Sequence, residues 1–219
     1  MIENKSVLDF GAGGGGYVCI VKDVVKDIYT VELEKSMQDA IKAEGIQCFS
    51  SVDEFKTKLP NQKFDVITLF HVLEHLQSPI EILQSLSELL AENGRFVVEV
   101  PNADDALLSL YRSEAFADFT YWMCHLYLYT NKTLTQLIKT AGLKISFLQQ
   151  IQRYSLANHL YWLSKEMPGG HQKWASLCDD VLDKHYGDKL AKLGIADTIM
   201  AVIEKDETNC NAQMCGKKT

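Results

Sequence analysis

The sequence predicts an α/β protein built on a parallel sheet. Strand-like and helix-like segments alternate along most of the 219 residues, a pattern typical of a sheet with helices on both faces. The segment FDVITLF, residues 64–70, is almost continuously apolar, as expected of a strand buried on both faces. The first strand leads directly into GAGGGG, residues 11–16, a turn suited to holding an adenosine-bearing cofactor ahead of a helix.

The first part of the chain contains four predicted strands and two predicted helices. The strands are expected at 6–10, 28–32, 46–50 and 64–70. One helix is expected over 15–26, and the second stops at Gly45, a residue type common just after a helix. Their buried faces are predicted from apolar residues at helical spacing: Val18, Val21, Val25, Met37, Ala40 and Ile41.

The later part of the chain continues the alternation. A helix follows Pro79 and ends at ENG, residues 92–94, and strands are predicted at 95–100, 143–151 and 197–205. Between them, a helix over 131–141 has Thr130 as its expected N-cap. The sequence therefore divides into a core over 1–151, an insertion over 152–196, a last core strand over 197–205 and a polar tail over 206–219 that we predict to be disordered.

Composition excludes several classes of protein. A content of 47% hydrophobic and 23% charged residues is typical of an ordinary globular protein. The net charge of −7 argues against a nucleic-acid partner. No apolar run approaches the roughly 18 residues of a membrane span. Six scattered cysteines form no CxxC pair, so we expect reduced thiols and a cytoplasmic location.

The glycine-rich turn admits more than one cofactor. Gly11, Gly13 and Gly16 match a dinucleotide-binding pattern, with Glu32 as the acid on the second strand. Asp9 favours a different ligand, because its carboxylate would repel a pyrophosphate but attract the cationic amino group of S-adenosylmethionine. No Lys-Ser or Lys-Thr pair follows the glycines, which excludes a triphosphate-binding P-loop. An NAD-dependent oxidoreductase or a non-catalytic cofactor-binding subunit remains the alternative.

Four motifs resolve this choice when they are taken together. The glycine turn after Asp9, Glu32 followed by Met37, FDVITLFHVLEHL at 64–76 and ENGRFVVEVPN at 92–102 resemble the class I S-adenosylmethionine-dependent methyltransferases, in the small-molecule branch with an EHL motif. This resemblance implies a seven-stranded Rossmann-like sheet of order 3-2-1-4-5-7-6 with strand seven antiparallel. Such enzymes usually carry a leading helix, so we expect that the chain is a fragment or has been trimmed.

The resemblance also implies where the cofactor binds. The glycine turn is expected to approach the amino-acid moiety and Glu32 to hold both ribose hydroxyls. Leu33, Ser51 and Val52 are expected around the adenine, and Phe70 and His71 beneath the methionine part. The cofactor-binding residues implied are Asp9, Gly11, Gly13, Gly15, Glu32, Leu33, Ser51, Val52, Phe70 and His71.

Histidines after the fourth and fifth strands are candidates for the chemistry. A hydroxyl acceptor needs a nearby base, and His125 and His71 are the predicted catalytic residues. The set His71, Glu74, His75 and His125 is also similar to the ExxEH-plus-His metal set of a plant small-RNA 2′-O-methyltransferase. We expect no metal here, because His71 replaces the first acid of that set.

The insertion over 152–196 is predicted to be a mostly helical cap over the acceptor. Leu156, Leu160 and Leu163, with Tyr161 and Trp162, are expected to pack its first helix onto the core. The predicted substrate-binding residues are Arg153, Tyr154, His159 and His171. The expected acceptor is a small molecule, foremost a hydroxyl of a sugar, sugar nucleotide or similar metabolite; a purely structural cap or a homodimer contact is the alternative for this segment.

Overall fold

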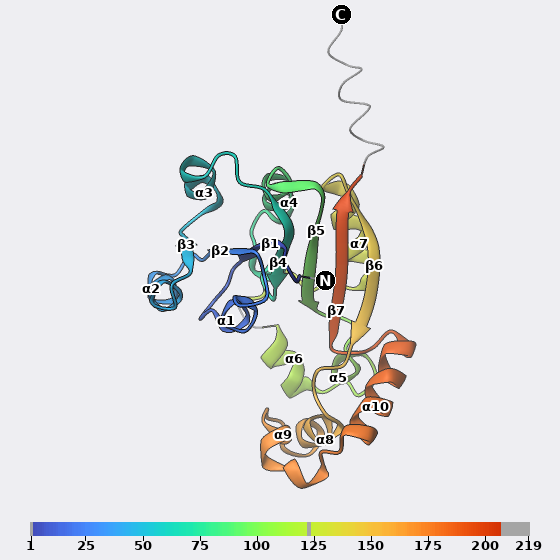
Figure 1. Ribbon diagram of the computed structural model, residues 1–219. Coiled ribbons are helices and arrows are strands. Elements are labelled where there is room, and N and C mark those ends of the chain that lie inside the picture. Colours follow the sequence, from blue (N-terminus) through green and yellow to red (C-terminus); the bar gives the residue numbers. More distant parts are fainter. Residues whose placement is uncertain (1, 122–123, 207–219) are drawn as a thin grey trace, which may run out of the picture.

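Seven strands form one mixed sheet at the centre of the protein (Figure 1). The computed structural model describes residues 2–121 and 124–206. The strand order is β3-β2-β1-β4-β5-β7-β6, and β7 is antiparallel to both of its neighbours. The predicted order and direction are therefore confirmed. The strands are β1 (Ser6–Phe10), β2 (Asp27–Val31), β3 (Gln47–Phe49), β4 (Phe64–Phe70), β5 (Leu90–Pro101), β6 (Leu143–Ile151) and β7 (Thr198–Lys205).

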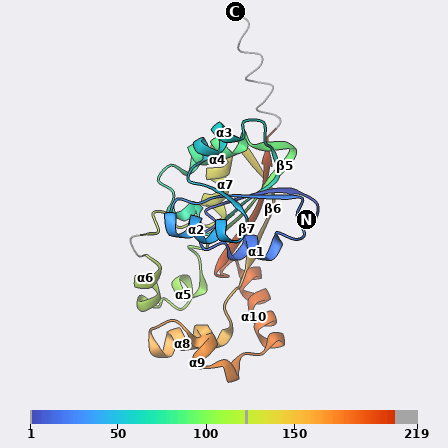
Figure 2. The ribbon, with the colours of Figure 1, turned by 60° about the vertical axis from the view of Figure 1, so that its left-hand side comes forward.

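Helices connect the strands and extend beyond one end of the sheet (Figures 1 and 2). The α-helices are α1 (Gly16–Val21), α2 (Lys35–Ala43), α3 (Val52–Lys58), α4 (Pro79–Ser87), α5 (Ala106–Ser109), α6 (Glu114–Thr120), α7 (Asn131–Thr140), α8 (Leu156–Lys165), α9 (Gly170–Lys173) and α10 (Asp180–Leu193). Two short 3₁₀-helices are η1 (Leu73–His75) and η2 (Ala175–Leu177). The predicted tail lies, apart from Asp206, outside the described residues.

Alternation along the strands divides the core between the two faces of the sheet. Successive strand residues point to opposite faces. Leu8, Ile67 and Phe96 belong to the largest buried cluster, which α3, α4 and α7 help to form. Their chain neighbours Val7, Val66 and Val97 form a separate cluster. The sheet is thus buried on both faces at its centre, which is why residues 64–70 carry no polar alternation.

Two helices differ from the sequence prediction. Helix α1 ends at Val21 rather than near residue 26, because the following residues bond to the chain start, with Lys26 N donating to Lys5 O and Asn4 N donating to Val24 O. In α2, Gln38 is buried while Met37 and Ala40 are exposed. Gln38 turns inward because its amide donates to Glu32 O at 2.8 Å.

A helical cap covers the sheet end at which β5 and β6 finish (Figures 1 and 2). It contains α8, α9 and α10 from the predicted insertion, and also α5 and α6, which the sequence analysis did not predict. Trp162 joins the two parts, with its ring 5.1 Å from the Phe116 ring and 5.3 Å from the Phe119 ring.

The buried face of α8 also differs from the prediction. Leu160 and Leu163 are 41% and 43% exposed, so they do not pack this helix onto the core. Tyr161 and Trp162 are buried as expected, together with the polar Asn158 and His159. The polar pair is tolerated because Asn158 accepts a hydrogen bond from Gly170 N and His159 bonds to Tyr186.

Candidate active site

The glycine turn takes the backbone shape that its sequence demands. Gly11, Gly13 and Gly15 have φ of 77°, 52° and 79°, values that side chains disfavour. A Cβ on Gly11 would lie 2.5 Å from Val72 Cγ2, so this position needs glycine for space as well. A Cβ on Gly13 would meet no described atom within 4 Å, which leaves the middle of the turn open to a ligand.

Glu32 is held in place by the backbone around it. Its Oε2 accepts a hydrogen bond from Gly13 N at 2.8 Å, and its Oε1 accepts one from Glu34 N at 2.9 Å. Each oxygen of a carboxylate can accept more than one hydrogen bond. The side chain is therefore fixed at the end of β2 with acceptor capacity for a vicinal diol.

A cavity of about 660 Å³ lies beside the turn and Glu32. Six predicted cofactor residues line it: Gly11, Glu32, Leu33, Ser51, Val52 and His71. Leu33 is 85% exposed, as a side chain placed to cover a ligand would be. Ser51 is also the N-cap of α3, a helix that the sequence analysis missed, and its Oγ accepts from Glu54 N at 3.0 Å.

The other predicted cofactor residues lie around this cavity without lining it. Asp9 is buried behind the turn, where its Oδ1 accepts a hydrogen bond from Thr68 Oγ1 at 2.6 Å. Burial raises the pKa of Asp9 to about 6. Phe70 packs edge-on against Tyr17 with ring centroids 4.9 Å apart. Gly13 and Gly15 shape the turn, so these four residues support the site from behind.

A second cavity, of about 330 Å³, lies under the cap. Its apolar wall includes Leu108, Phe116 and Phe119, and Arg153 and Tyr154 add polar groups. The two cavities share His71 and His75 as lining residues. The histidines that follow β4 therefore stand where a cofactor in one cavity would meet an acceptor in the other.

His71 is held between two carboxylates. Its Nδ1 lies 3.4 Å from Glu74 Oε1 and its Nε2 lies 3.1 Å from Glu99 Oε1. Partial burial disfavours the charged ring, but the two carboxylates outweigh it and raise the pKa of His71 to about 9. Its φ of 55° is unusual for a residue with a side chain, and the backbone is held there by His71 N donating to Glu99 O at 2.8 Å.

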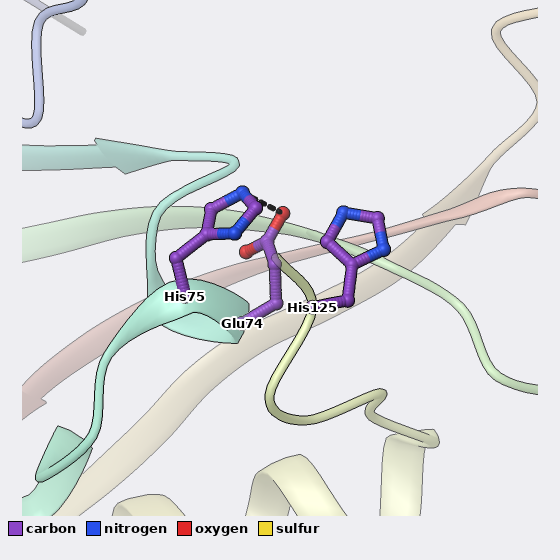
Figure 3. Close-up of side chains that lie close together, drawn as sticks. All are labelled: Glu74, His75 and His125. Carbon is purple, nitrogen blue, oxygen red and sulfur yellow. Dashed lines mark ion pairs between the residues drawn. The ribbon is translucent and has the colours of Figure 1, made fainter. Parts of the chain in front are cut away.

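Glu74, His75 and His125 lie close together (Figure 3) and all line the second cavity. One ligand-type atom from each lies within 4.8 Å of the others. The loop with His125 is tied to η1 by Leu126 N and Tyr127 N, which both donate to Glu74 O. These bonds hold His125 beside the EHL motif, about 50 residues earlier in the chain, and His125 lines the second cavity.

The predicted substrate residues fall into two groups. Arg153 and Tyr154 line the second cavity, and Tyr154, His159 and His171 line a smaller cavity that adjoins it. Arg153 Nη1 lies 3.2 Å from Glu99 Oε1 and also contacts His71 Nε2. His159 is only 1% exposed, and burial lowers its pKa to about 4.

Three residues of this region escaped the sequence analysis. Glu99 stands at the end of β5, where it joins His71 to Arg153. Its position two residues before Pro101, at the carboxyl end of a strand, was the available signal. Phe116 and Phe119 belong to α6, whose start is marked by the N-cap Ser113 accepting from Phe116 N.

Among residues 2–121 and 124–206, no helix is long and apolar enough to cross a membrane.

Comparison with known proteins places the chain among methyltransferases. A family model described as "Methyltransferase domain" matches residues 2–146. A ubiquinone biosynthesis O-methyltransferase of Histophilus somni (strain 2336) is 36% identical over 106 residues, which are 42% of this chain and 43% of that protein. The chain thus spans less than half the length of the curated relatives it matches.

Solved structures share the fold. A SAM-dependent methyltransferase from Archaeoglobus fulgidus has a TM-score of 0.55 and 20% identity, covering 92% of this chain and 86% of that one. An S-adenosylmethionine-dependent methyltransferase from Mesorhizobium loti has a TM-score of 0.59 and 13% identity, covering 93% and 92%. With the family match over residues 2–146, these findings confirm the expected cofactor class over a dinucleotide. The chain belongs to the family of S-adenosylmethionine-dependent methyltransferases with the class I fold.

Proposed function

We propose that this protein transfers the methyl group of S-adenosylmethionine to a hydroxyl of a small molecule that contains a ring. One observation carries the proposal: the cavity beside Gly11 and Glu32 and the cavity under the cap meet at His71 and His75. A methyl donor in the first and an acceptor in the second would react at this junction. In-line transfer requires chiefly that the two reactants be aligned and kept from water.

The acceptor class is inferred from the second cavity. Leu108, Phe116 and Phe119 suit a ring that packs against apolar surface. The matched relative is named as an O-methyltransferase, and its printed pathway concerns a quinone. We therefore place a phenol-like hydroxyl first among acceptors. The sugar or sugar-nucleotide acceptor expected from the sequence remains a prediction, for which Arg153 is the supporting residue.

His125 is the proposed base for the hydroxyl proton. Its Nδ1 donates to Thr120 O at 2.7 Å, so Nε2 carries the lone pair of the neutral ring. In Figure 3 a nitrogen of this ring lies on the side of Glu74 and His75. His71 suits a positioning role instead, because both of its ring nitrogens face carboxylates.

A product assay tests the proposal. The protein would be incubated with S-adenosylmethionine and a panel of phenols, catechols and sugar nucleotides, and both products would be identified by mass spectrometry. We expect S-adenosylhomocysteine and a methyl ether of a ring hydroxyl. Cofactor binding without turnover on any hydroxyl, or methylation at nitrogen alone, would contradict the proposal.

A further inference from the structure

We propose that Glu74, His75 and His125 bind one divalent first-row transition-metal ion in the wall of the second cavity, which is called the acceptor cavity from here on. From the sequence we expected no metal, because His71 stands in place of an acid. The folded structure adds three observations that favour an ion and that do not involve His71 as a ligand.

The first observation is the burial of Glu74. Its residue exposure is 0%, and neither carboxylate oxygen accepts a hydrogen bond from any described residue. The nearest side-chain nitrogens are at ion-pair distance only, with His71 Nδ1 at 3.4 Å and His75 Nε2 at 3.9 Å from Oε1. A buried carboxylate without hydrogen bonds is costly, and coordination of a cation would offset that cost.

The second observation is the orientation of the two imidazoles. His75 Nδ1 donates to Cys124 O at 2.6 Å, and His125 Nδ1 donates to Thr120 O at 2.7 Å. A backbone carbonyl can only accept, so in both neutral rings the lone pair is on Nε2. Metal-binding histidines commonly donate their other nitrogen to a carbonyl in this way. Two lone pairs and a carboxylate are thereby directed at one place (Figure 3).

The third observation is the spacing of the three groups. Their ligand atoms lie within 4.8 Å of one another. Two atoms around a tetrahedral ion with bonds of about 2.1 Å are about 3.4 Å apart, so small side-chain rotations would complete the site. Two imidazole nitrogens with one carboxylate suit zinc, iron, cobalt or manganese better than magnesium or calcium.

The site would leave coordination positions open toward the acceptor, because all three residues line its cavity. This role of the ion rests on the proposed function. A hydroxyl bound to the ion has a lowered pKa and would lose its proton to solvent, because Nε2 of His125, the base proposed for the metal-free site, would be a ligand of the ion. Its oxygen would then form a bond to the methyl carbon as the carbon–sulfur bond breaks, and the sulfonium would become a neutral thioether.

Direct metal titration tests the site without reference to activity. The full chain would be stripped with a chelator, dialysed and titrated with Co²⁺ and Zn²⁺, with visible absorption and calorimetry as readouts. We expect one ion per chain, with a Co²⁺ spectrum of nitrogen and oxygen ligands. Absence of saturable binding, or a spectrum dominated by thiolate charge transfer, would overturn the proposal.

Variants locate the ion. Glu74→Gln keeps the side-chain shape, and His125→Ala changes a half-buried loop residue; each should weaken binding on the order of 100-fold or more, since second-shell changes alone cost about 10–100-fold. His185→Ala, an exposed histidine on α10, is the matched control and should bind as the unchanged protein does. S-adenosylhomocysteine affinity checks that each variant is folded. Equal metal binding by Glu74→Gln would place the ion elsewhere.

Activity then separates the two proposals. Methyl transfer that persists undiminished in the stripped, metal-free protein would reject the ion's role in the reaction but keep the proposed function. Stoichiometric metal binding lost in Glu74→Gln, with no hydroxyl methylated under any metal, would keep the site and reject the function. We expect turnover that chelation abolishes and that Zn²⁺, Co²⁺ or Mn²⁺ restores.

Discussion

At the scale of single residues, the site depends on side chains that the backbone already holds. Glu32 is fixed by the amides of Gly13 and Glu34, and His71 by Glu74 and Glu99. Such side chains lose little conformational entropy when a ligand binds. Less of the energy of their contacts is therefore spent on ordering them than for mobile side chains. Substitutions at this scale should separate cofactor binding from acceptor binding.

Glu32→Ala should weaken cofactor binding. Loss of hydrogen bonds to a charged acceptor costs about 1.5–3 kcal/mol, or about 10- to 150-fold in affinity. Calorimetry with S-adenosylhomocysteine measures the change, and Glu34→Ala, an exposed acid two residues away, is the control. Unchanged affinity in Glu32→Ala would mean that the ribose is held by other groups.

Arg153→Ala should impair use of the acceptor while cofactor affinity stays within about twofold. Arg153 lines the second cavity, the one proposed for the acceptor, but not the cavity beside Glu32 that is proposed for the cofactor. Steady-state kinetics distinguish a raised KM, which indicates lost uniform binding, from a lowered kcat, which indicates contacts made in the transition state. Arg153→Lys keeps the charge but not the planar fork, and Lys165→Ala on α8 is the surface control. A full loss of cofactor binding in Arg153→Ala would contradict this assignment.

At the scale of elements, the cap is assembled from two segments that are distant in sequence. Helix α6 and helix α8 meet through Phe116, Phe119 and Trp162. Helix α9 packs closely against α8 at Gly170. A Cβ atom added at this position would lie 2.4 Å from Tyr161 Cβ and 2.6 Å from Ala157 O. The wall of the acceptor cavity therefore depends on contacts between short helices.

Gly170→Ala should loosen this contact and destabilise the protein. An added methyl group in a packed region costs about 1–3 kcal/mol, and here the atoms in the way include backbone. Denaturant unfolding measures the loss. Gly16→Ala, where a Cβ would meet no described atom within 4 Å and φ is not positive, should stay near neutral. Equal stability of the two variants would show that α9 can shift at no cost.

At the scale of the whole molecule, buried ionisable groups couple stability to pH. Burial is the main cause that raises the pKa of Asp105 to about 7 and the pKa of Asp9 to about 6. Burial also lowers the pKa of His159 to about 4. These two acids make the protein more stable as pH falls, because the folded state takes up their protons more readily than the unfolded state does. His159 acts in the opposite direction, since it stays neutral in the fold while the unfolded chain takes up a proton below about pH 6.5.

His159→Gln should flatten the acid side of the stability profile. The lowered pKa predicts that the contribution of His159 to the free energy of unfolding falls by about 2 kcal/mol when the pH is lowered from 7 to 5. The free energy of unfolding would be measured at both pH values for the unchanged protein and for the variant. Asp9 and Asp105 are present in both proteins, so the difference between the two pH dependences reports the contribution of His159. Parallel slopes would show that His159 is protonated in the folded state at pH 5.

The sequence alone determined the sheet and named most of the residues around the first cavity. β1, β4 and β6 have the predicted bounds, because apolar runs, glycine turns and helix caps are local signals that need no partner. Gly11, Glu32, Leu33, Ser51 and Val52 could be placed because each follows directly from a strand end in a known topology. The helix face of α2 could not, since Gln38 is buried by a bond to Glu32 O that only the fold creates.

Only the tertiary structure decided the acceptor half. The cap joins residues 106–120 to 156–193, a pairing that leaves no periodic trace in the chain. A resemblance had named Glu74, His75 and His125 together, but only the fold shows that their ligand atoms converge. The isolation of the Glu74 carboxylate is likewise invisible in the sequence, because it depends on what surrounds the side chain once the loop with His125 bonds to η1. Burial and convergence are properties of contacts between distant segments, and only folding produces them.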